Sequence, residues 1–151
     1  MVKKPKDDLT DADYEALSNL RYTLRRFMDF SASAAQEEGL PAQQHQALLA
    51  IRGYRGEDAM TIGILAERLL IAPHSATELV GRLVAAGYVL RQTDPADKRR
   101  QTLELTKKAD DILERLTAIH LTEIRDMAPR LIDILRGLQA GGELDINPWS
   151  R

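Results

Sequence analysis

Three consecutive cations stand in a short turn-like sequence, DPADKRR, and their side chains are suited to hold a polyanion. Lys98, Arg99 and Arg100 have long stems, so they can reach phosphates or enter the minor groove of a duplex, where the potential is most negative. Asp94 and Asp97 are expected to structure the turn, because Asp caps turns through its own side chain and can hold an Arg by paired hydrogen bonds. A lone charged turn is usually a solvated hairpin tip, so the neighbouring elements must decide its role.

The segments on either side of this turn are strand-like. In residues 101–106, Leu103 and Leu105 alternate with Thr102 and Glu104, and residues 88–93 form the preceding segment. Together they predict a β-hairpin that carries the three cations at its tip.

An amphipathic helix is predicted just before the hairpin, from Pro73 to Ala86, and Gly87 suits its C′ position. Its expected buried stripe consists of Ala76, Leu79, Val80, Leu83 and Val84. Its N-terminal end presents small polar residues instead. The residues that we take as candidate DNA contacts on this helix are His74, Ser75, Thr77, Glu78 and Arg82.

A shorter helix precedes it, capped by Thr61 and followed by a break at Ile71 and Ala72. Two short helices joined by a tight turn are typical of a helix-turn-helix, although many αα-hairpins have the same pattern. A helix-turn-helix pattern followed directly by a basic hairpin arises by chance much less often than either pattern alone. The pattern therefore predicts a winged helix.

Long helical patterns flank this region. The first begins after Thr10 and ends at Gly39, and the second starts at Lys107, where Pro129 predicts a division into helices 107–127 and 130–138. Part of the first helix suits contact with either a second subunit or another helix of the same chain. Trp149 in the tail suits packing on a partner subunit or covering the core. Lys107 and Lys108 stand at the unfavourable end of a helix dipole, so they either contact phosphates or are screened by solvent.

Composition excludes several classes of protein. The chain has 151 residues, 44% of them hydrophobic and 29% charged, which is typical of one soluble globular domain. No apolar run approaches the length of a membrane span, the start MVKKPKDD does not resemble a signal peptide, and the absence of Cys excludes thiol chemistry. We therefore expect a cytoplasmic protein with no membrane association. The net charge of −2 argues against general nucleic-acid binding but allows a local basic patch.

No catalytic or metal-binding constellation is evident. His45, His74 and His120 fall in different elements without ligand spacing, and the sequence contains no Gly-rich phosphate loop or Ser nucleophile motif. We expect no enzyme activity, no metal and no cofactor. His74 is a candidate phosphate or base contact, whereas His45 and His120 are expected to be structural.

The residues resemble the MarR-type transcriptional regulators over about two thirds of the chain. The hairpin carries the most specific match, the wing signature D-P-x-D-x-R. A further helix is predicted from Pro41. The matching positions are Leu40 and Gln44 at the start of that helix, Leu65, Ala66 and Leu69 in the helix capped by Thr61, Arg82, Leu83 and Gly87 at the end of the helix from Pro73, Asp94, Pro95, Asp97 and Arg99 in the wing, and Leu105 and Thr106 after it.

This resemblance implies a mainly α fold with a small β-wing, in a single domain of residues 1–151. A winged-helix lobe of about 41–106 would be joined to dimerisation helices of about 10–38 and 107–138. It also implies a homodimer on double-stranded DNA with pseudo-palindromic half-sites, with recognition helices in successive major grooves and wings on the minor groove or backbone. Most such regulators repress, and many are released by a small, often aromatic, ligand that binds between the dimer helices and the DNA-binding lobe.

The sequence departs from the family's pattern at three positions. Glu78 stands where many members have Arg, Ala72 where Ser often caps the helix, and Ala109 where Gly is common. Glu can accept a hydrogen bond from the cytosine amino group, but it also repels phosphates. A winged-helix protein-interaction module without DNA binding is therefore the alternative function. A small-molecule binding protein that borrows the fold has no positive support in the sequence.

Overall fold

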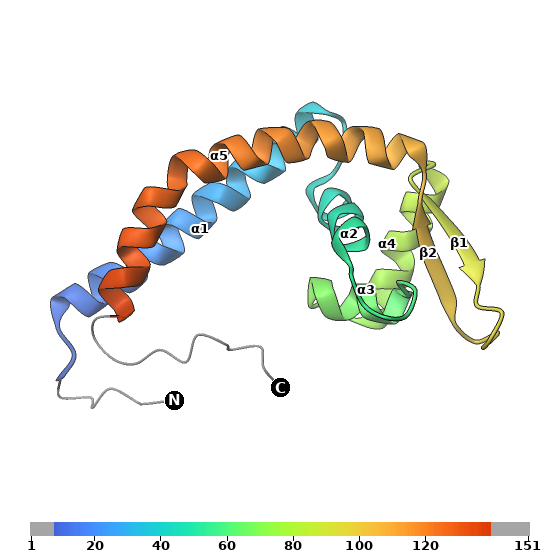
Figure 1. The fold of residues 1–151 in the computed structure, drawn as a ribbon, viewed down its shortest axis with the longest axis horizontal. Helices are drawn as coiled ribbons and strands as arrows, with labels where there is room; N and C mark the ends of the chain where they lie inside the picture. The colour runs from blue at the N-terminus through green and yellow to red at the C-terminus, as the bar shows by residue number, and fades with distance from the viewer. Residues whose placement is uncertain (1–7, 140–151) are drawn as a thin grey trace. The chain divides into compact units, whose positions relative to one another are not determined.

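The computed structural model describes residues 8–139, and its five helices and two strands confirm the predicted fold class (Figure 1). In chain order the elements are α1 (Asp11–Glu37), α2 (Ala42–Gly53), α3 (Ile62–Leu69), α4 (Pro73–Ala85), β1 (Val89–Thr93), β2 (Gln101–Leu105) and α5 (Lys107–Gln139). None of the helices in these residues has the length and apolar character that a bilayer crossing requires. Trp149 lies outside the described residues.

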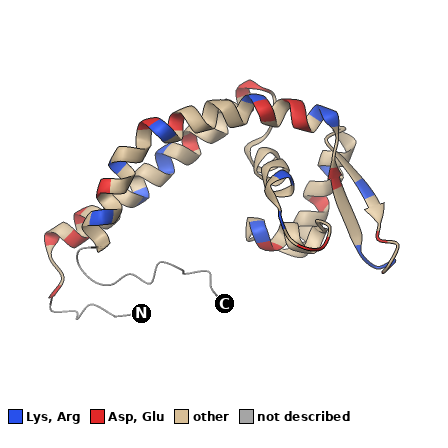
Figure 2. Cartoon of the chain, viewed as in Figure 1, with Lys and Arg blue, Asp and Glu red and all other residues tan. Residues whose placement is uncertain are grey.

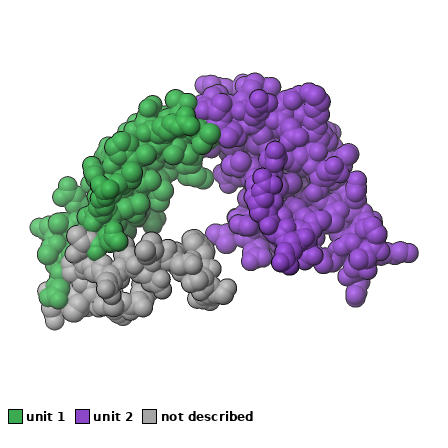
Figure 3. All heavy atoms as spheres, in the orientation of Figure 1, with its two compact units in different colours: residues 1–30, 120–151 green, residues 31–119 purple. Residues whose placement is uncertain are grey.

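The chain divides into two compact units (Figure 3). Residues 1–30 and 120–151 belong to the first unit, so its described part consists of most of α1 and the later turns of α5. Residues 31–119 form the second unit, which contains α2, α3, α4 and the hairpin. Its largest fully buried side chains are Leu40, Leu48, Leu65, Leu79, Val80, Leu83, Val89 and Leu116.

Local chemistry sets both ends of α1. The backbone N–H of Thr10 donates to the Asp13 carboxylate at 2.7 Å, which satisfies a donor at the helix start and places negative charge in the first turn. The helix ends as predicted at Gly39, whose φ of +76° is readily adopted only by glycine. Leu40 is fully buried after this turn and its N–H donates to the Ala35 carbonyl at 2.9 Å, a Schellman-type end.

The first unit contains a small aromatic contact between α1 and α5. His120 is 7% exposed and packs edge-on against Phe27 and Phe30, with ring centroids 6.0 and 5.8 Å apart. Edge-to-face packing at such distances is a favourable geometry for aromatic rings. His120 is therefore a packing residue, in agreement with its expected structural role.

The predicted division of the last helix at Pro129 is wrong, because α5 runs without interruption from Lys107 to Gln139. Proline lacks the N–H that would bond the Arg125 carbonyl, so the helix continues with one i→i−4 hydrogen bond missing. Side chains of α5 on both sides of Pro129 line a space shared with α1, which shows that α5 keeps its neighbour past this point. The helical hydrogen bonds on either side of Pro129 keep the helix continuous despite this one loss.

The hairpin is fastened to the helix-turn-helix by backbone bonds. β1 and β2 pair antiparallel, with Val89 opposite Leu105 and Arg91 opposite Leu103. The N–H of Leu103 donates to the Met60 carbonyl at 2.9 Å, and Thr102 forms an isolated bridge with Thr61. Because Thr61 is also the N-cap of α3, one short segment fixes both the wing and the start of the helix-turn-helix.

Candidate nucleic-acid interface

The turn between α3 and α4 has the tight geometry of a helix-turn-helix. The Thr61 hydroxyl accepts a hydrogen bond from the Ile64 N–H at 3.2 Å, so the predicted cap of α3 is confirmed. The helix closes at Leu70, which is left-handed at φ +54° and 87% exposed, and the Ile71 N–H returns to the Ala66 carbonyl. α4 then begins at Pro73 with Ala72 as an N-cap that makes no side-chain hydrogen bond.

One face of α4 is buried largely as the sequence predicts. Ala76, Leu79, Val80 and Leu83 are at most 1% exposed, but the prediction was wrong for Val84, which is 36% exposed. An α-helix turns by about 100° per residue, so Val84 lies at the edge of a stripe centred near Leu79 and Leu83. Because this stripe faces the core, the polar side of α4 faces solvent.

That polar side carries the candidate base-reading residues. His74, Thr77, Glu78 and Arg82 are exposed, and Ser75 is half-buried. The Thr77 hydroxyl donates to the Pro73 carbonyl at 3.1 Å, so it has only lone pairs left for a ligand. Thr77 and Glu78 therefore both present hydrogen-bond acceptors in the first half of α4, whereas the guanidinium donors of Arg82 lie in its last turn.

The wing tip is preformed by its two aspartates. Asp94 Oδ1 accepts from the Ala96 N–H at 2.9 Å, and Asp97 Oδ1 accepts from the Arg99 N–H at 3.0 Å. The Asp94 N–H also bonds the Arg100 carbonyl at 2.9 Å, which closes the loop across its base. Arg99 Nε lies 3.4 Å from Asp97 Oδ1, and the Arg99 side chain remains 93% exposed. An ion pair this exposed adds little stability, so the guanidinium is available to another anion.

Arg91 is a candidate interface residue that the sequence analysis did not name. It follows Val89 by two residues on β1, so both side chains leave the strand on the same face. Val89 is buried on that face, and the Arg91 guanidinium lies over α4, 3.9 Å from the position that a Cβ on Gly81 would occupy. The signal available in the sequence was an arginine in the inward phase of a strand that directly follows the recognition helix.

The two lysines at the start of α5 both have partners. Lys107 Nζ pairs with Asp111 one turn later at 3.0 Å. Lys108 Nζ instead donates to the Ala86 carbonyl at 2.6 Å, at the C-terminal end of α4. The sequence suggested that these lysines either contact phosphates or are screened by solvent. The structure shows a third role, because both make contacts within the chain.

Charges of both signs lie on α4 and the hairpin (Figure 2). The cations are Arg82, Arg91, Lys98, Arg99 and Arg100, and the anions are Glu78, Asp94, Asp97 and Glu104. Asp94 and Asp97 are half-buried and bonded to the loop backbone, whereas the three tip cations are exposed. The positive field is consequently concentrated at the wing tip, and Glu78 introduces negative charge on the recognition helix. Within residues 8–139, no cluster of His, Asp and Glu could hold a metal ion.

The helix-turn-helix and wing also match a family model. Residues 38–100, which include α2, α3, α4, β1 and the wing tip, match the model described as MarR family. This region, residues 38–100, belongs to the MarR family. The resemblance inferred from the sequence is thus confirmed, and the family consists of transcriptional regulators and not of enzymes.

Individual relatives agree with this assignment. The chain is 28% identical over 114 residues to the transcriptional activatory protein BadR of Rhodopseudomonas palustris; the match covers 73% of this chain and 65% of BadR, less than two thirds of its length. Its fold is similar to AbsC, a MarR family regulator from Streptomyces coelicolor, with a TM-score of 0.70, 20% identity and coverage of 87% and 90% of the two chains. It is also similar to the F27L mutant of Staphylococcus aureus MepR bound to an oligodeoxyribonucleotide, with a TM-score of 0.62, 19% identity and coverage of 87% and 100%.

Proposed function

We propose that this MarR regulator binds double-stranded DNA sequence-specifically, with α4 in the major groove and the β1–β2 wing on the adjacent backbone or minor groove. The observation that carries the proposal is the wing tip, where Asp94 and Asp97 fix the loop and leave Lys98, Arg99 and Arg100 exposed. Cations held on a preformed loop contact phosphates at a lower cost in conformational entropy than cations on a loose one.

The polar face of α4 supports a distinct kind of base recognition. Thr77 and Glu78 both present acceptors, which match the amino groups that cytosine and adenine expose in the major groove. Arg82 presents donors and suits guanine or a phosphate, and His74 and Ser75 lie at the helix start, where recognition helices usually contact bases. We therefore infer half-sites in which a cytosine or adenine faces the first half of α4.

A homodimer belongs to the same proposal. Large hydrophobic residues are exposed along α1 and α5, whereas a monomeric protein rarely exposes extended apolar patches. These residues are Tyr14, Leu17, Tyr22, Leu24 and Met28 on α1, and Ile119, Leu121, Ile124, Ile132 and Leu135 on α5. A second copy of the chain would cover them, and its two-fold symmetry requires a pseudo-palindromic DNA site.

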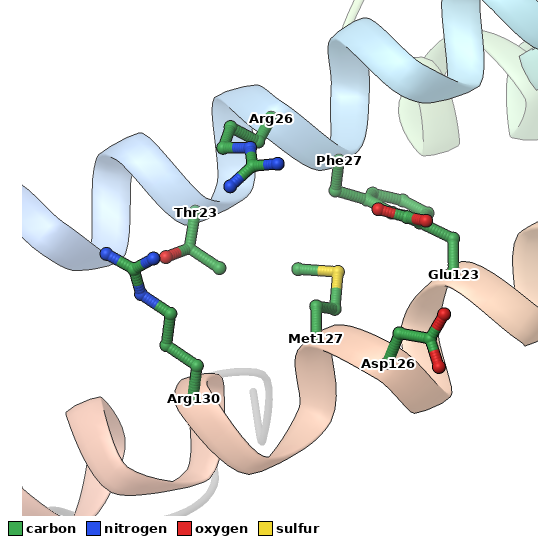
Figure 4. A pocket seen from close by; sticks show the side chains of 7 residues that line it. All are labelled: Thr23, Arg26, Phe27, Glu123, Asp126, Met127 and Arg130. Atoms are coloured by element: carbon green, nitrogen blue, oxygen red, sulfur yellow. The ribbon is translucent and has the colours of Figure 1, made fainter.

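The proposal includes control by a small molecule and action in the cytoplasm. In the first unit, α1 and α5 enclose a pocket of about 230 Å³ (Figure 4). The pocket joins the apolar side chains of Phe27 and Met127 to two guanidinium groups and two carboxylates, which suits a small ligand with an apolar body and polar groups. The charged side chains are those of Arg26, Arg130, Glu123 and Asp126. We infer a repressor that such a ligand releases, although BadR, a relative, is named as an activatory protein.

Selection of bound duplexes from a random DNA pool tests the proposal directly. We expect enrichment of a two-fold related motif whose affinity falls steeply as the salt concentration rises, because phosphate contacts release counterions. Enrichment of no motif, together with binding that does not depend on salt, would contradict the proposal. That outcome would favour the protein-interaction module, to which the exposed Glu78 is better suited.

A further inference from the structure

The first turn of α5 touches the far end of the recognition helix through a single lysine. Lys108 Nζ donates to the Ala86 carbonyl at 2.6 Å and lies 4.5 Å from the centroid of the Tyr88 ring. Ala86 is the C-cap of α4, and Tyr88 is the last residue before β1. One ammonium group therefore contacts both the end of the recognition helix and the start of the wing.

The energetics of this position explain why a cation stands there. A positive charge is unfavourable at the start of its own helix, but the C-terminal end of a helix dipole attracts it. The Lys108 side chain reaches from the first turn of α5 to the C-terminal end of α4, where the Ala86 carbonyl accepts a hydrogen bond from its ammonium group. The Tyr88 ring adds a cation–π contact, which stabilises an ammonium most when the ring is close.

Thr106 makes a second connection at the same place. Its hydroxyl donates to the Gly87 carbonyl at 2.7 Å and accepts from the Ala109 N–H at 3.3 Å, so it caps α5 while holding the residue that ends α4. The Thr106 N–H also donates to the Tyr88 carbonyl at 3.0 Å. Gly87 has a φ of +80°, so the turn between α4 and β1 has a defined backbone conformation that these bonds can hold.

We propose that Lys108 is a positioning residue for DNA recognition: it clamps the C-terminal end of α4 to α5 and so fixes the recognition helix relative to the wing. The clamp consists of Lys108 and Thr106 together with the carbonyls of Ala86, Gly87 and Tyr88 that they hold. This role rests on the proposed DNA-binding function and deepens it. Because these hydrogen bonds join the start of α5 to the end of α4, a displacement of the first turn of α5 would displace the end of α4 with it.

The alternative is that Lys108 binds a DNA phosphate, and one pair of substitutions separates the two roles. Lys108→Met removes the ammonium but keeps an unbranched stem beside Gly87. Lys107→Met is the matched control, because it removes the same charge from the preceding residue, whose ammonium pairs with Asp111 and does not touch α4. Lys108→Arg keeps a cationic donor and should rescue most of the effect.

The measurements are fluorescence anisotropy with the duplex selected by the wild-type protein and with a shuffled duplex, each over a range of salt concentrations. For Lys108→Met we expect affinity for the selected duplex to fall about tenfold, equivalent to about 1.4 kcal/mol. Affinity for the shuffled duplex and the salt slope should stay unchanged, and Lys107→Met should behave as wild type. An equal loss on both duplexes with a slope lower by about one would instead identify Lys108 as a phosphate contact and overturn the proposal.

Amide hydrogen exchange provides a test without DNA. In Lys108→Met, amides of residues 82–88 should exchange faster than in the wild type and in Lys107→Met, because the end of α4 loses its tether. Unchanged exchange there would overturn the clamp even if DNA affinity fell. If the wild-type protein bound no duplex at all, the proposed function would fail, and the exchange result alone would decide whether the clamp exists.

Discussion

Leu70 is the non-glycine residue with a left-handed backbone in residues 8–139, at φ +54°. This conformation brings the Cβ of an L-residue too close to the following carbonyl oxygen, at a cost of roughly 1–2 kcal/mol. The Leu70 side chain is 87% exposed, so little burial compensates for the strain. The turn of the helix-turn-helix requires the conformation, because the Leu70 and Ile71 amides close α3 onto its own carbonyls.

Leu70→Gly should therefore raise the free energy of unfolding by up to about 1 kcal/mol, since relief of strain exceeds the extra entropy of glycine in the unfolded chain. Urea denaturation followed by circular dichroism would measure this as a higher midpoint with an unchanged slope. Leu70→Ala is the control, because it removes the same exposed side chain but keeps the Cβ. A gain as large in the alanine variant would show that the strain is not the cause.

Arg99 is a tip cation that Asp97 holds twice, through a hydrogen bond to its backbone N–H and an ion pair with its side chain. Arg99→Ala should lower affinity for the selected duplex by at least about tenfold, or about 1.4 kcal/mol, and should reduce the salt slope by about one. Arg55→Ala is the matched control, since it removes an exposed arginine from the loop between α2 and α3. A gel-shift titration in which both variants bind like wild type would exclude the wing from DNA binding.

Residue-level prediction from sequence succeeded where the chemistry is local. The Thr61 cap and the stop at Gly39 follow from side chains and backbone within a few residues, and the structure confirms both. Arg91 and Lys108 were beyond such reasoning, because their contacts join segments that only the folded chain brings together. The base contacts proposed for α4 stay predictions.

At the scale of elements, apolar periodicity predicted the helices and the hairpin, because each buries one face. The rule that proline ends a helix predicted a boundary at Pro129, and this prediction was wrong. One missing hydrogen bond does not outweigh the many that form on either side of it, so α5 continues past the proline, and Arg130 beyond it still lines the space shared with α1. A single unfavourable residue is therefore a weak predictor of where a long helix ends.

Pro129→Ala should stabilise the protein by about 1–3 kcal/mol, because it restores the missing helical hydrogen bond and Pro129 is exposed, so that little packing is lost. Thermal unfolding at a fixed protein concentration would show a higher midpoint. Asp133→Ala, at an exposed position of the same helix, changes only helix propensity and should shift stability by less than about 0.7 kcal/mol. A lower midpoint for Pro129→Ala would mean that the proline is needed for the course of α5.

At the scale of the whole molecule, the exposed hydrophobic residues of α1 and α5 are the surface on which the proposed homodimer rests. Periodicity in the sequence showed that both helices are apolar, but it did not separate residues that face the same chain from those that face outward. The structure makes that distinction: Leu116 is fully buried in the second unit, whereas Leu121 and Ile124 on the same helix are 44% and 40% exposed. Since burial of apolar surface contributes about 25 cal/mol per Å², such a face favours association.

The double substitution Leu121→Glu and Ile124→Glu should convert a dimer into a monomer, because two carboxylates would be buried in the proposed interface without counter-charges. Sedimentation at micromolar concentration should give a dimer for the wild type and for Leu49→Glu, a control that places a carboxylate at an exposed position of α2. Affinity of the double variant for a duplex with two half-sites should fall by at least about a hundredfold, since the second binding event is no longer linked to the first. Its affinity for a single half-site should be retained. A monomeric wild type, or a dimeric double variant, would remove the two-half-site arrangement.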